Sequence, residues 1–179
     1  MSHPLIVTAL LGESDFAVLD DLRRRHFPPE RNFLRAHLTM FHHLPPSVGT
    51  EVADRLKQMT RQPAPVAALA GIMNLGRGVA FRVESPGLAD MRAELADAFA
   101  IVLTPQDRAV WRPHVTIQNK VVPEEARDLL RLLERDFAPR PLELAGLALF
   151  RYVNGPWETV GAWRFGNGHR MSPPPPLTR

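Results

Sequence analysis

Two short segments of this 179-residue chain share one pattern, and the repetition constrains the fold more than any other feature. Residues 35–40 read Arg-Ala-His-Leu-Thr-Met and residues 112–117 read Arg-Pro-His-Val-Thr-Ile, both of the form Arg-x-His-aliphatic-Thr-aliphatic. Side chains alternate between the two faces of a β-strand. The pattern therefore predicts two strands that each carry His and Thr on one face and aliphatic residues on the other. The Arg of each motif lies on the face of His and Thr if the strand extends so far.

Two such polar faces, set opposite each other, would form a cleft suited to phosphodiester chemistry. Displacement at phosphorus needs a base for the attacking oxygen and an acid for the leaving oxygen, and histidine, with a pKa of about 6.5, can serve as either. Threonine hydroxyls can donate hydrogen bonds to the phosphoryl oxygens. Which histidine is the base stays open. The predicted catalytic residues are His37, Thr39, His114 and Thr116.

Hydrophobic patterning and helix-capping signals predict alternating strands and helices along the rest of the chain. The predicted strands are residues 4–11, 36–43, 66–75, 78–84, 114–121, 142–152 and 157–165. The predicted helices run from a cap at Ser14 or Asp15 to residue 26, from a cap at Ser47 to residue 60, and over 86–99 and 123–136. Residues 100–112 look irregular, and residues 171–179, with four consecutive prolines, are expected to form an extended, disordered tail.

The tandem His-Leu-Thr-Met and His-Val-Thr-Ile segments, 77 positions apart, resemble the two-histidine phosphoesterase superfamily, also called the 2′-5′ RNA ligase-like family. The resemblance covers most of the chain. It implies an α+β fold with a bilobal pseudo-twofold arrangement of two antiparallel-rich sheets around a central cleft, helices on the outer faces, and a single domain over residues 1–170. The segment after the first motif, Phe41-His42-His43-Leu44-Pro45, differs from the family's usual apolar run ending in Gly, which leaves the substrate class open.

The family includes cyclic nucleotide phosphodiesterases, RNA-end-processing enzymes and RNA ligases. The resemblance implies a phosphoesterase, independent of metal and cofactor, that acts on 2′,3′-cyclic phosphate or 2′-5′ phosphodiester bonds of nucleotides or RNA ends. We favour hydrolysis over ligation because hydrolysis needs only one bound nucleotide end. Further candidates are three arginines for phosphate, one amide on the face of His114 and two aromatic residues that can stack on a base. They are Arg35, Arg112, Arg151, Gln118, Tyr152 and Trp157.

The composition of the chain limits the classes of ligand and partner that we expect. The net charge of +3 and the pI of about 10.1 come from 20 arginines and 2 lysines, a balance that favours a small anionic ligand over long nucleic acid. The lack of cysteine excludes disulfides, thiolate nucleophiles and cysteine-bound zinc. No apolar run reaches the roughly 20 residues that span a bilayer, and the apolar N-terminal stretch reads as a strand. We therefore expect a cytoplasmic monomer without a membrane partner.

Two other functions remain open. A non-catalytic RNA- or nucleotide-binding protein could use the same cleft. The two histidines argue against this alternative, because arginine would suffice for binding alone. A metal-dependent hydrolase is disfavoured because the seven histidines are scattered and form no His-x-x-x-His pair. His42 and His43 are adjacent, so on a regular strand they face opposite ways; one of them could lie at the edge of the cleft, but a strand-end position near solvent is the simpler interpretation. Arg23, Arg24 and Arg25 are expected to form a solvated helix end.

Overall fold

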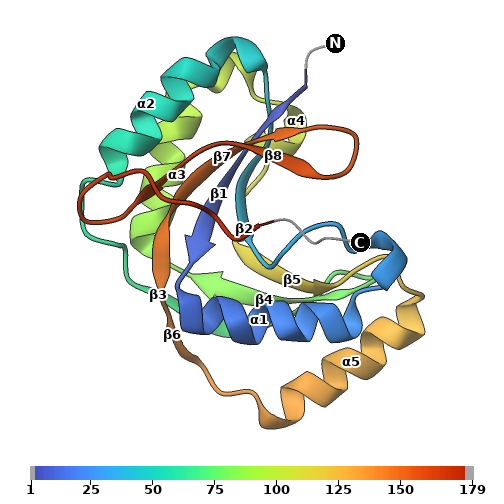
Figure 1. Ribbon diagram of the computed structural model, residues 1–179. Coiled ribbons are helices and arrows are strands. Elements are labelled where there is room, and N and C mark those ends of the chain that lie inside the picture. The colour runs from blue at the N-terminus through green and yellow to red at the C-terminus, as the bar shows by residue number, and fades with distance from the viewer. Residues whose placement is uncertain (1–2, 176–179) are drawn as a thin grey trace.

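Eight strands form one antiparallel sheet in the computed structural model of this protein, which describes residues 3–175 (Figure 1). Their spatial order is β6-β3-β4-β5-β2-β1-β7-β8. The strands are β1 (Leu5–Leu11), β2 (Leu38–Leu44), β3 (Ala67–Asn74), β4 (Val79–Glu84), β5 (His114–Gln118), β6 (Arg140–Leu142), β7 (Leu144–Tyr152) and β8 (Trp157–Arg164). The α-helices are α1 (Glu13–His26), α2 (Gly49–Met59), α3 (Pro86–Ala98), α4 (Pro105–Arg108) and α5 (Pro123–Asp136), and the 3-10 turns are η1 (Pro29–Arg31), η2 (Pro46–Val48) and η3 (Ala100–Val102).

The strand order divides the sheet into two halves of four strands, which meet between β5 and β2. The unit β1-α1-β2 in one half corresponds to β4-α3-β5 in the other, so each half contains a strand, a helix and a returning strand. This arrangement confirms the predicted α+β fold with two related lobes. The two expected sheets are the halves of one curved sheet, joined where Leu38 of β2 pairs with Val115 of β5.

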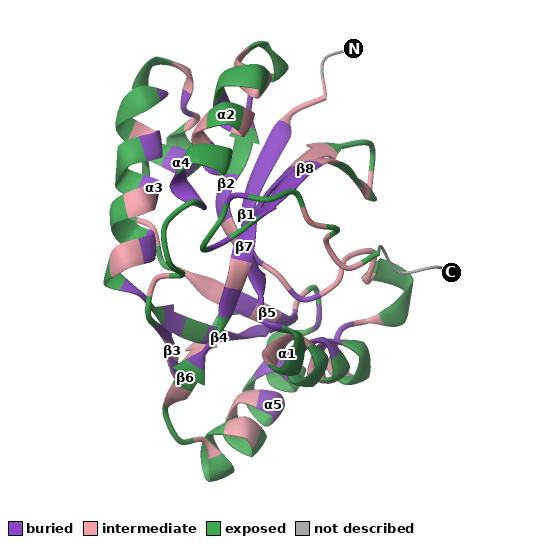
Figure 2. Cartoon of the chain, turned by 60° about the vertical axis from the view of Figure 1, so that its left-hand side comes forward, coloured by how far each residue is buried: buried purple, intermediate pink, exposed green. Residues whose placement is uncertain are grey.

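Burial follows the alternation that the two motifs predict. Leu38, Val115 and Ile117 have no exposed surface, whereas the histidine and threonine of each motif are only partly buried. Helix α1 packs against β5, α2 against β7 and β8, and α5 against β3. The buried strands run through the centre of the molecule with exposed helix faces around them (Figure 2). The core therefore anchors both motif strands while their polar side chains stay accessible.

Two predicted helix caps are wrong. Helix α1 is capped by Gly12 and α2 by Val48, and neither cap makes a side-chain hydrogen bond. Ser47 lies in the turn η2 instead. Asp15 makes long-range contacts instead: one carboxylate oxygen accepts a hydrogen bond from the N–H of Glu143, and the other forms an ion pair with Arg140. The start of α1 is thus held by the β6–β7 connection.

The elements around the second motif also differ from the prediction. The stretch expected to be irregular contains η3 and α4, and the Thr104 hydroxyl caps α4 by accepting the N–H of Asp107. Strand β5 ends at Gln118, because Lys120 adopts the left-handed conformation with φ of 64°. A short strand, β6, precedes β7 and pairs with β3.

The last described residues, 171–175, form no helix or strand. The N–H of Met171 donates to the carbonyl of Ala162, and Nη1 of Arg35 donates to the carbonyl of Pro175 at 3.3 Å. The rest of the predicted tail, residues 176–179, lies outside the described residues. Within residues 3–175, no helix is both long and apolar enough to cross a membrane.

Candidate active site

The two motifs pair with each other across the junction of the half-sheets. Because the strands are antiparallel and Leu38 is opposite Val115, the register places His37 opposite Thr116 and Thr39 opposite His114. Each histidine therefore lies across from the threonine of the other motif. Directly opposed residues on one face have their Cβ atoms about 5 Å apart. The structure thus brings all four predicted catalytic residues together from segments far apart in the sequence.

Both imidazoles are held in the same way. Nδ1 of His37 lies 2.7 Å from the carbonyl oxygen of Arg35, and Nδ1 of His114 lies 2.7 Å from that of Arg112. A carbonyl oxygen only accepts, so Nδ1 carries the proton in both rings. In the neutral ring, Nε2 then keeps its lone pair. The residue two positions before each histidine thus fixes through its backbone which nitrogen can exchange a proton with a substrate.

The environments of the two histidines differ. Burial is the main cause that lowers the pKa of His37 to about 4, and the nearby charge of Arg23 lowers it further, against the opposing effect of its hydrogen bond to Arg35. Its ring lies 4.8 Å from that of Trp157 between centroids, at an interplanar angle of 59°. The backbone hydrogen bond of His37 is partly buried, whereas that of His114 is exposed to solvent. His37 is therefore neutral at pH 7.

Arg23 is a buried cation beneath the site, which corrects its expected place on a solvated helix end. Its Nε donates to Asn32 Oδ1 at 2.9 Å and to the Leu34 carbonyl at 3.0 Å, while Nη1 donates to the Thr116 carbonyl at 3.0 Å. Burial lowers its pKa to about 10, opposed by Asp20, so the guanidinium stays charged at neutral pH. The other two members of the triplet, Arg24 and Arg25, are exposed as expected.

Two pockets border the paired motifs. The first, beside His37, is largely apolar and includes Phe150, Trp157 and, from the C-terminal segment, Pro174. The second holds Thr39, His114 and Thr116 together with polar neighbours. The remaining polar or charged residues that line the second pocket are His42, Arg92, Gln106, Asp107, Arg112 and Asn119. One side of the paired histidines is thus apolar and the other polar.

The residues predicted to contact substrate differ in their position relative to the two pockets. Arg112 lines the second pocket beside His114. Arg35 lines the first pocket, but its Nε pairs with the buried carboxylate of Asp20 at 2.8 Å. Gln118 is buried, and its Oε1 has no hydrogen-bond partner among the described residues. Their contacts with substrate remain predictions.

The last hairpin contributes the predicted aromatic residues. Trp157 borders the first pocket and, with Tyr152, a third hollow that also contains His42 and His43. Arg151 pairs with Glu158 at 3.1 Å on the exposed part of the hairpin. Trp157, through its contact with His37, is therefore the hairpin residue nearest to the proposed chemistry.

One residue of the first pocket has no signal in the sequence. Thr8 of β1 is opposite Thr39 of β2, is fully buried, and its Oγ1 has no hydrogen-bond partner within residues 3–175. It lines the pocket beside His37. A single threonine in an apolar strand looks like ordinary β-sheet composition. Its closeness to the site depends on the pairing of β1 with β2, which the sequence does not specify.

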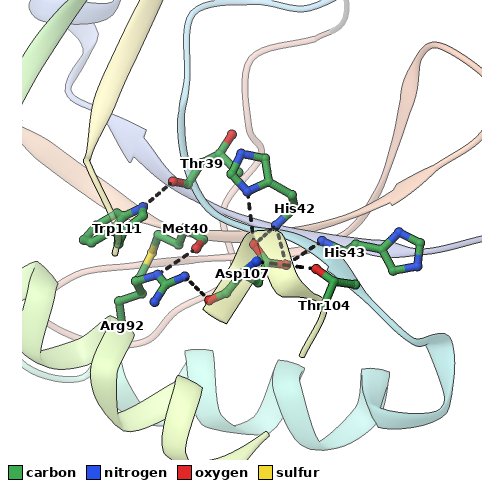
Figure 3. Close-up of polar contacts among 8 residues, drawn as sticks. All are labelled: Thr39, Met40, His42, His43, Arg92, Thr104, Asp107 and Trp111. Atoms are coloured by element: carbon green, nitrogen blue, oxygen red, sulfur yellow. Dashed lines mark hydrogen bonds and ion pairs between the residues drawn. The ribbon is translucent and has the colours of Figure 1, made fainter. Parts of the chain in front are cut away.

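A second set of residues that the sequence did not indicate fixes the strand after the first motif (Figure 3). The indole N–H of Trp111 donates to the carbonyl of Thr39 at 3.1 Å. Nε of Arg92 donates to the carbonyl of Met40 at 3.0 Å, and Nη2 donates to the carbonyl of Asp107 at 2.7 Å. These bonds link β2 to α3 and to the segment before β5. In the part of the chain that the structure describes, no group of three or more His, Cys, Asp or Glu is placed to hold a metal ion.

A two-lobed α+β sheet that pairs one His-x-Thr strand from each half is the architecture of the two-histidine phosphoesterases. A family model described as the 2′-5′ RNA ligase superfamily matches residues 12–156. The chain belongs to this family.

Solved structures share the fold. The crystal structure of E. coli LigT complexed with 3′-AMP is 17% identical, covers 92% of this chain and 99% of that one, and has a TM-score of 0.57. The protein TT0787 of Thermus thermophilus is 20% identical, with coverage of 94% and 100% and a TM-score of 0.58. A crystal structure described only as a phosphoesterase gives 17% identity, coverage of 92% and 99%, and a TM-score of 0.58. No curated protein matches the sequence.

Proposed function

We propose that this protein is a metal-independent phosphoesterase that acts on 2′,3′-cyclic phosphate or 2′-5′ phosphodiester bonds of nucleotides or RNA ends. One observation carries the proposal: the motifs pair so that each histidine is opposite the other motif's threonine, with the proton of each neutral ring on Nδ1. With Nε2 of one imidazole unprotonated and Nε2 of the other protonated, the two rings supply a base and an acid, and the two adjacent hydroxyls supply two donors. In-line displacement at phosphorus needs these groups.

The difference between the two histidines favours one assignment of roles. In hydrolysis of a cyclic phosphate, Nε2 of His37 accepts a proton from water as the water oxygen bonds to phosphorus. The bond from phosphorus to the ribose oxygen breaks, and His114, which enters this step doubly protonated, donates its Nε2 proton to that oxygen. His37 suits the base in its protonation state, because a pKa of about 4 keeps it unprotonated at neutral pH, although a base with a pKa so far below the operating pH accepts a proton less readily. By microscopic reversibility, the roles exchange in ligation.

The remaining groups fit a phosphorylated nucleotide. The hydroxyls of Thr39 and Thr116 donate to the non-bridging oxygens, where negative charge accumulates. The polar pocket with Arg112 takes the phosphate, and Trp157 offers a stacking surface for a base on the side of His37. E. coli LigT, a relative in fold, has been solved with 3′-AMP and with ATP. We extend nucleotide binding to this chain on that basis.

The test is turnover of the four 2′,3′-cyclic nucleotides, with and without chelator, by the wild type and by the His37→Ala and His114→Ala variants. We expect turnover to survive chelation and to fall by about 10² to 10⁴ in either variant. The two losses should not multiply in the double variant, because the histidines act as a unit. His169→Ala, on the exposed C-terminal segment, is the matched control and should behave as wild type.

Two outcomes would overturn the proposal. Loss of turnover on chelation would indicate a metal-dependent hydrolase. Tight nucleotide binding without turnover would indicate the alternative function, a non-catalytic RNA- or nucleotide-binding protein that uses the same cleft.

A further inference from the structure

A third histidine, His42, is held by a buried carboxylate at the edge of the proposed active site. Nδ1 of His42 lies 3.1 Å from Oδ1 of Asp107, whose side chain has no exposed surface, whereas the His42 side chain is 41% exposed. The same carboxylate accepts the backbone N–H groups of His42 and His43 at 2.9 to 3.0 Å. Three donors from two consecutive residues therefore converge on one carboxylate.

This set of donors keeps Asp107 ionised. Burial alone would raise its pKa, but the hydrogen bonds from the His42 ring and from the two backbone N–H groups outweigh burial and lower it. An ionised carboxylate only accepts, so Nδ1 of His42 carries a proton. Nε2 is then the free position of the ring. Figure 3 shows this second nitrogen turned away from Asp107, with the ring beside the Thr39 side chain.

A β-bulge places His42 on the face of the catalytic threonine. Thr8 of β1 pairs with Thr39, but Val7 pairs with Phe41, so Met40 is an extra residue in β2. Met40 and Phe41 are consecutive and both fully buried, which agrees with a bulge that turns both side chains toward the core. After the bulge, the next residue to face the site is His42. It accordingly lines the pocket that holds Thr39, His114 and Thr116, while its side chain stays exposed near the strand end as expected.

The charges around this ring favour an anion. The titratable groups that line the pockets containing His42 are mostly basic, and Asp107, already saturated by donors, is the one carboxylate among the described residues that line them. The other titratable groups are Arg92 on α3, Arg112 and His114 at β5, His43 on β2, Tyr152 on β7, and His3 before β1. A phosphoryl oxygen at Nε2 would leave the His42 imidazolium between two anions, an arrangement that stabilises its charged form.

We propose that His42, oriented by Asp107, is a third substrate-contacting histidine, which donates Nε2–H to a non-bridging oxygen of the phosphoryl group that reacts between His37 and His114. This inference rests on the proposed function and adds a residue to it. Asp107 is a positioning residue, because it acts only through His42.

The kinetic test compares His42→Ala, His42→Gln, Asp107→Asn and the control His43→Gln on a 2′,3′-cyclic nucleotide. We expect kcat/KM to fall by about 10² to 10³ in His42→Ala, as for the loss of one donor to a developing oxyanion, in a variant that its thermal melting curve shows to be folded. His42→Gln retains an N–H donor and should recover most of the activity. Asp107→Asn should lie between the two, and His43→Gln, whose ring is turned away from Asp107 (Figure 3), should stay within twofold of wild type.

Equal losses in His43→Gln and His42→Ala, or wild-type kcat/KM in His42→Ala, would overturn the inference. Because Asp107→Asn could also disturb the strand that it holds, a second measurement observes the ring itself. Histidine side-chain ¹H–¹⁵N spectra of the wild type at pH 7 should show the His42 signals shifting when inorganic phosphate is added. Phosphate that leaves the His42 signals unchanged would also overturn it.

The two proposals can fail separately. If no cyclic nucleotide is turned over while phosphate still shifts the His42 signals, the proposed function is wrong and the phosphate contact stands. If the wild type is active but neither kcat/KM nor the spectra respond at His42, the proposed function stands and this inference is wrong.

Discussion

Nη1 of Arg23 donates a hydrogen bond to the carbonyl oxygen of Thr116, 3.0 Å away, and so ties helix α1 to the second motif strand. The same guanidinium holds Asn32 and the carbonyl of Leu34, just before the first motif. One buried cation therefore sets the position of both motifs, and its charge contributes to the low pKa of His37.

Replacing Arg23 should weaken the fold. In Arg23→Met, the partly buried acceptors at Asn32, Leu34 and Thr116 lose their donor, which we expect to lower the free energy of unfolding by about 2 to 4 kcal/mol. Urea denaturation measures this change. Arg24→Met, which removes an exposed cation from the same helix, should change the free energy by less than about 0.5 kcal/mol. Equal effects in the two variants would contradict the structural role of Arg23.

On the acidic side of its pH profile, the enzyme should lose activity only at an unusually low pH. The base must be unprotonated, and the pKa of His37 is lowered to about 4, so kcat/KM should begin to fall only as the pH approaches that value. A profile of kcat/KM from pH 3.5 to 9 checks this expectation. An acidic midpoint near 6.5, the ordinary value of histidine, would show that His37 is not the base of the free enzyme.

His37 should also make stability depend on pH. Its folded-state pKa is about 4 and its unfolded value about 6.5, so between these values the unfolded chain binds more protons and stability falls as the pH falls. The full difference corresponds to about 3 kcal/mol, which partial exposure of the ring reduces to about 1 to 2 kcal/mol. Denaturation of the wild type and His37→Gln at pH 4 and pH 7 measures the difference. The variant should show the smaller change, and identical changes would contradict the assignment.

The two threonine hydroxyls should matter for the transition state. Thr39→Val and Thr116→Val retain the β-branched shape but remove the donor, and each should lower kcat by about 10² to 10³ with little change in KM. Thr→Ser at either position keeps the hydroxyl and should restore most of the rate. If serine and valine have equal effects, the methyl group rather than the hydroxyl is what the site requires.

Trp157 should contribute to nucleotide affinity. A base stacked on its indole is worth about 1 to 3 kcal/mol, so Trp157→Ala should raise KM by roughly 5-fold to 150-fold, and Trp157→Phe should recover much of the loss. Phe150→Ala does not serve as a control because Phe150 packs on Trp157. Tyr152→Ala on the same hairpin is the comparison. A larger effect at Tyr152 than at Trp157 would place the base in the hollow beyond His42 instead.

The motif strands could be predicted because their alternation is nearly complete. His37 and Thr39 flank the buried Leu38, and His114 and Thr116 flank the buried Val115, so period-two patterning alone identifies the polar face. The long helices were predicted from apolar residues spaced three or four positions apart. The predicted helix caps are wrong because Ser47 lies in a 3-10 turn and Asp15 contacts the β6–β7 connection. These positions depend on tertiary contacts, which local sequence patterns do not indicate.

The supporting residues of the site could not be predicted. Arg23 and Asp107 look like ordinary charged residues of a helix end and a loop, and their roles arise from pairing with positions 93 and 65 residues away. The bulge at Met40 is similarly invisible, since only the register against β1 shows that one residue is extra. Sequence patterning identified the reacting groups, whereas the residues that orient them became apparent only with long-range contacts.

The place of β1 in the sheet has a consequence for biosynthesis. β1 lies between β2 and β7, so its second neighbour comes from residues 144–152. When a ribosome-bound chain has released both histidine motifs but not yet β7, one edge of β1 has no partner strand. All residues of β1 are buried in the complete fold, so this unpaired edge exposes residues that normally lie in the core. Such a chain contains every predicted catalytic residue and is still incomplete. Premature termination before residue 144 should therefore yield aggregating fragments rather than a partly active enzyme.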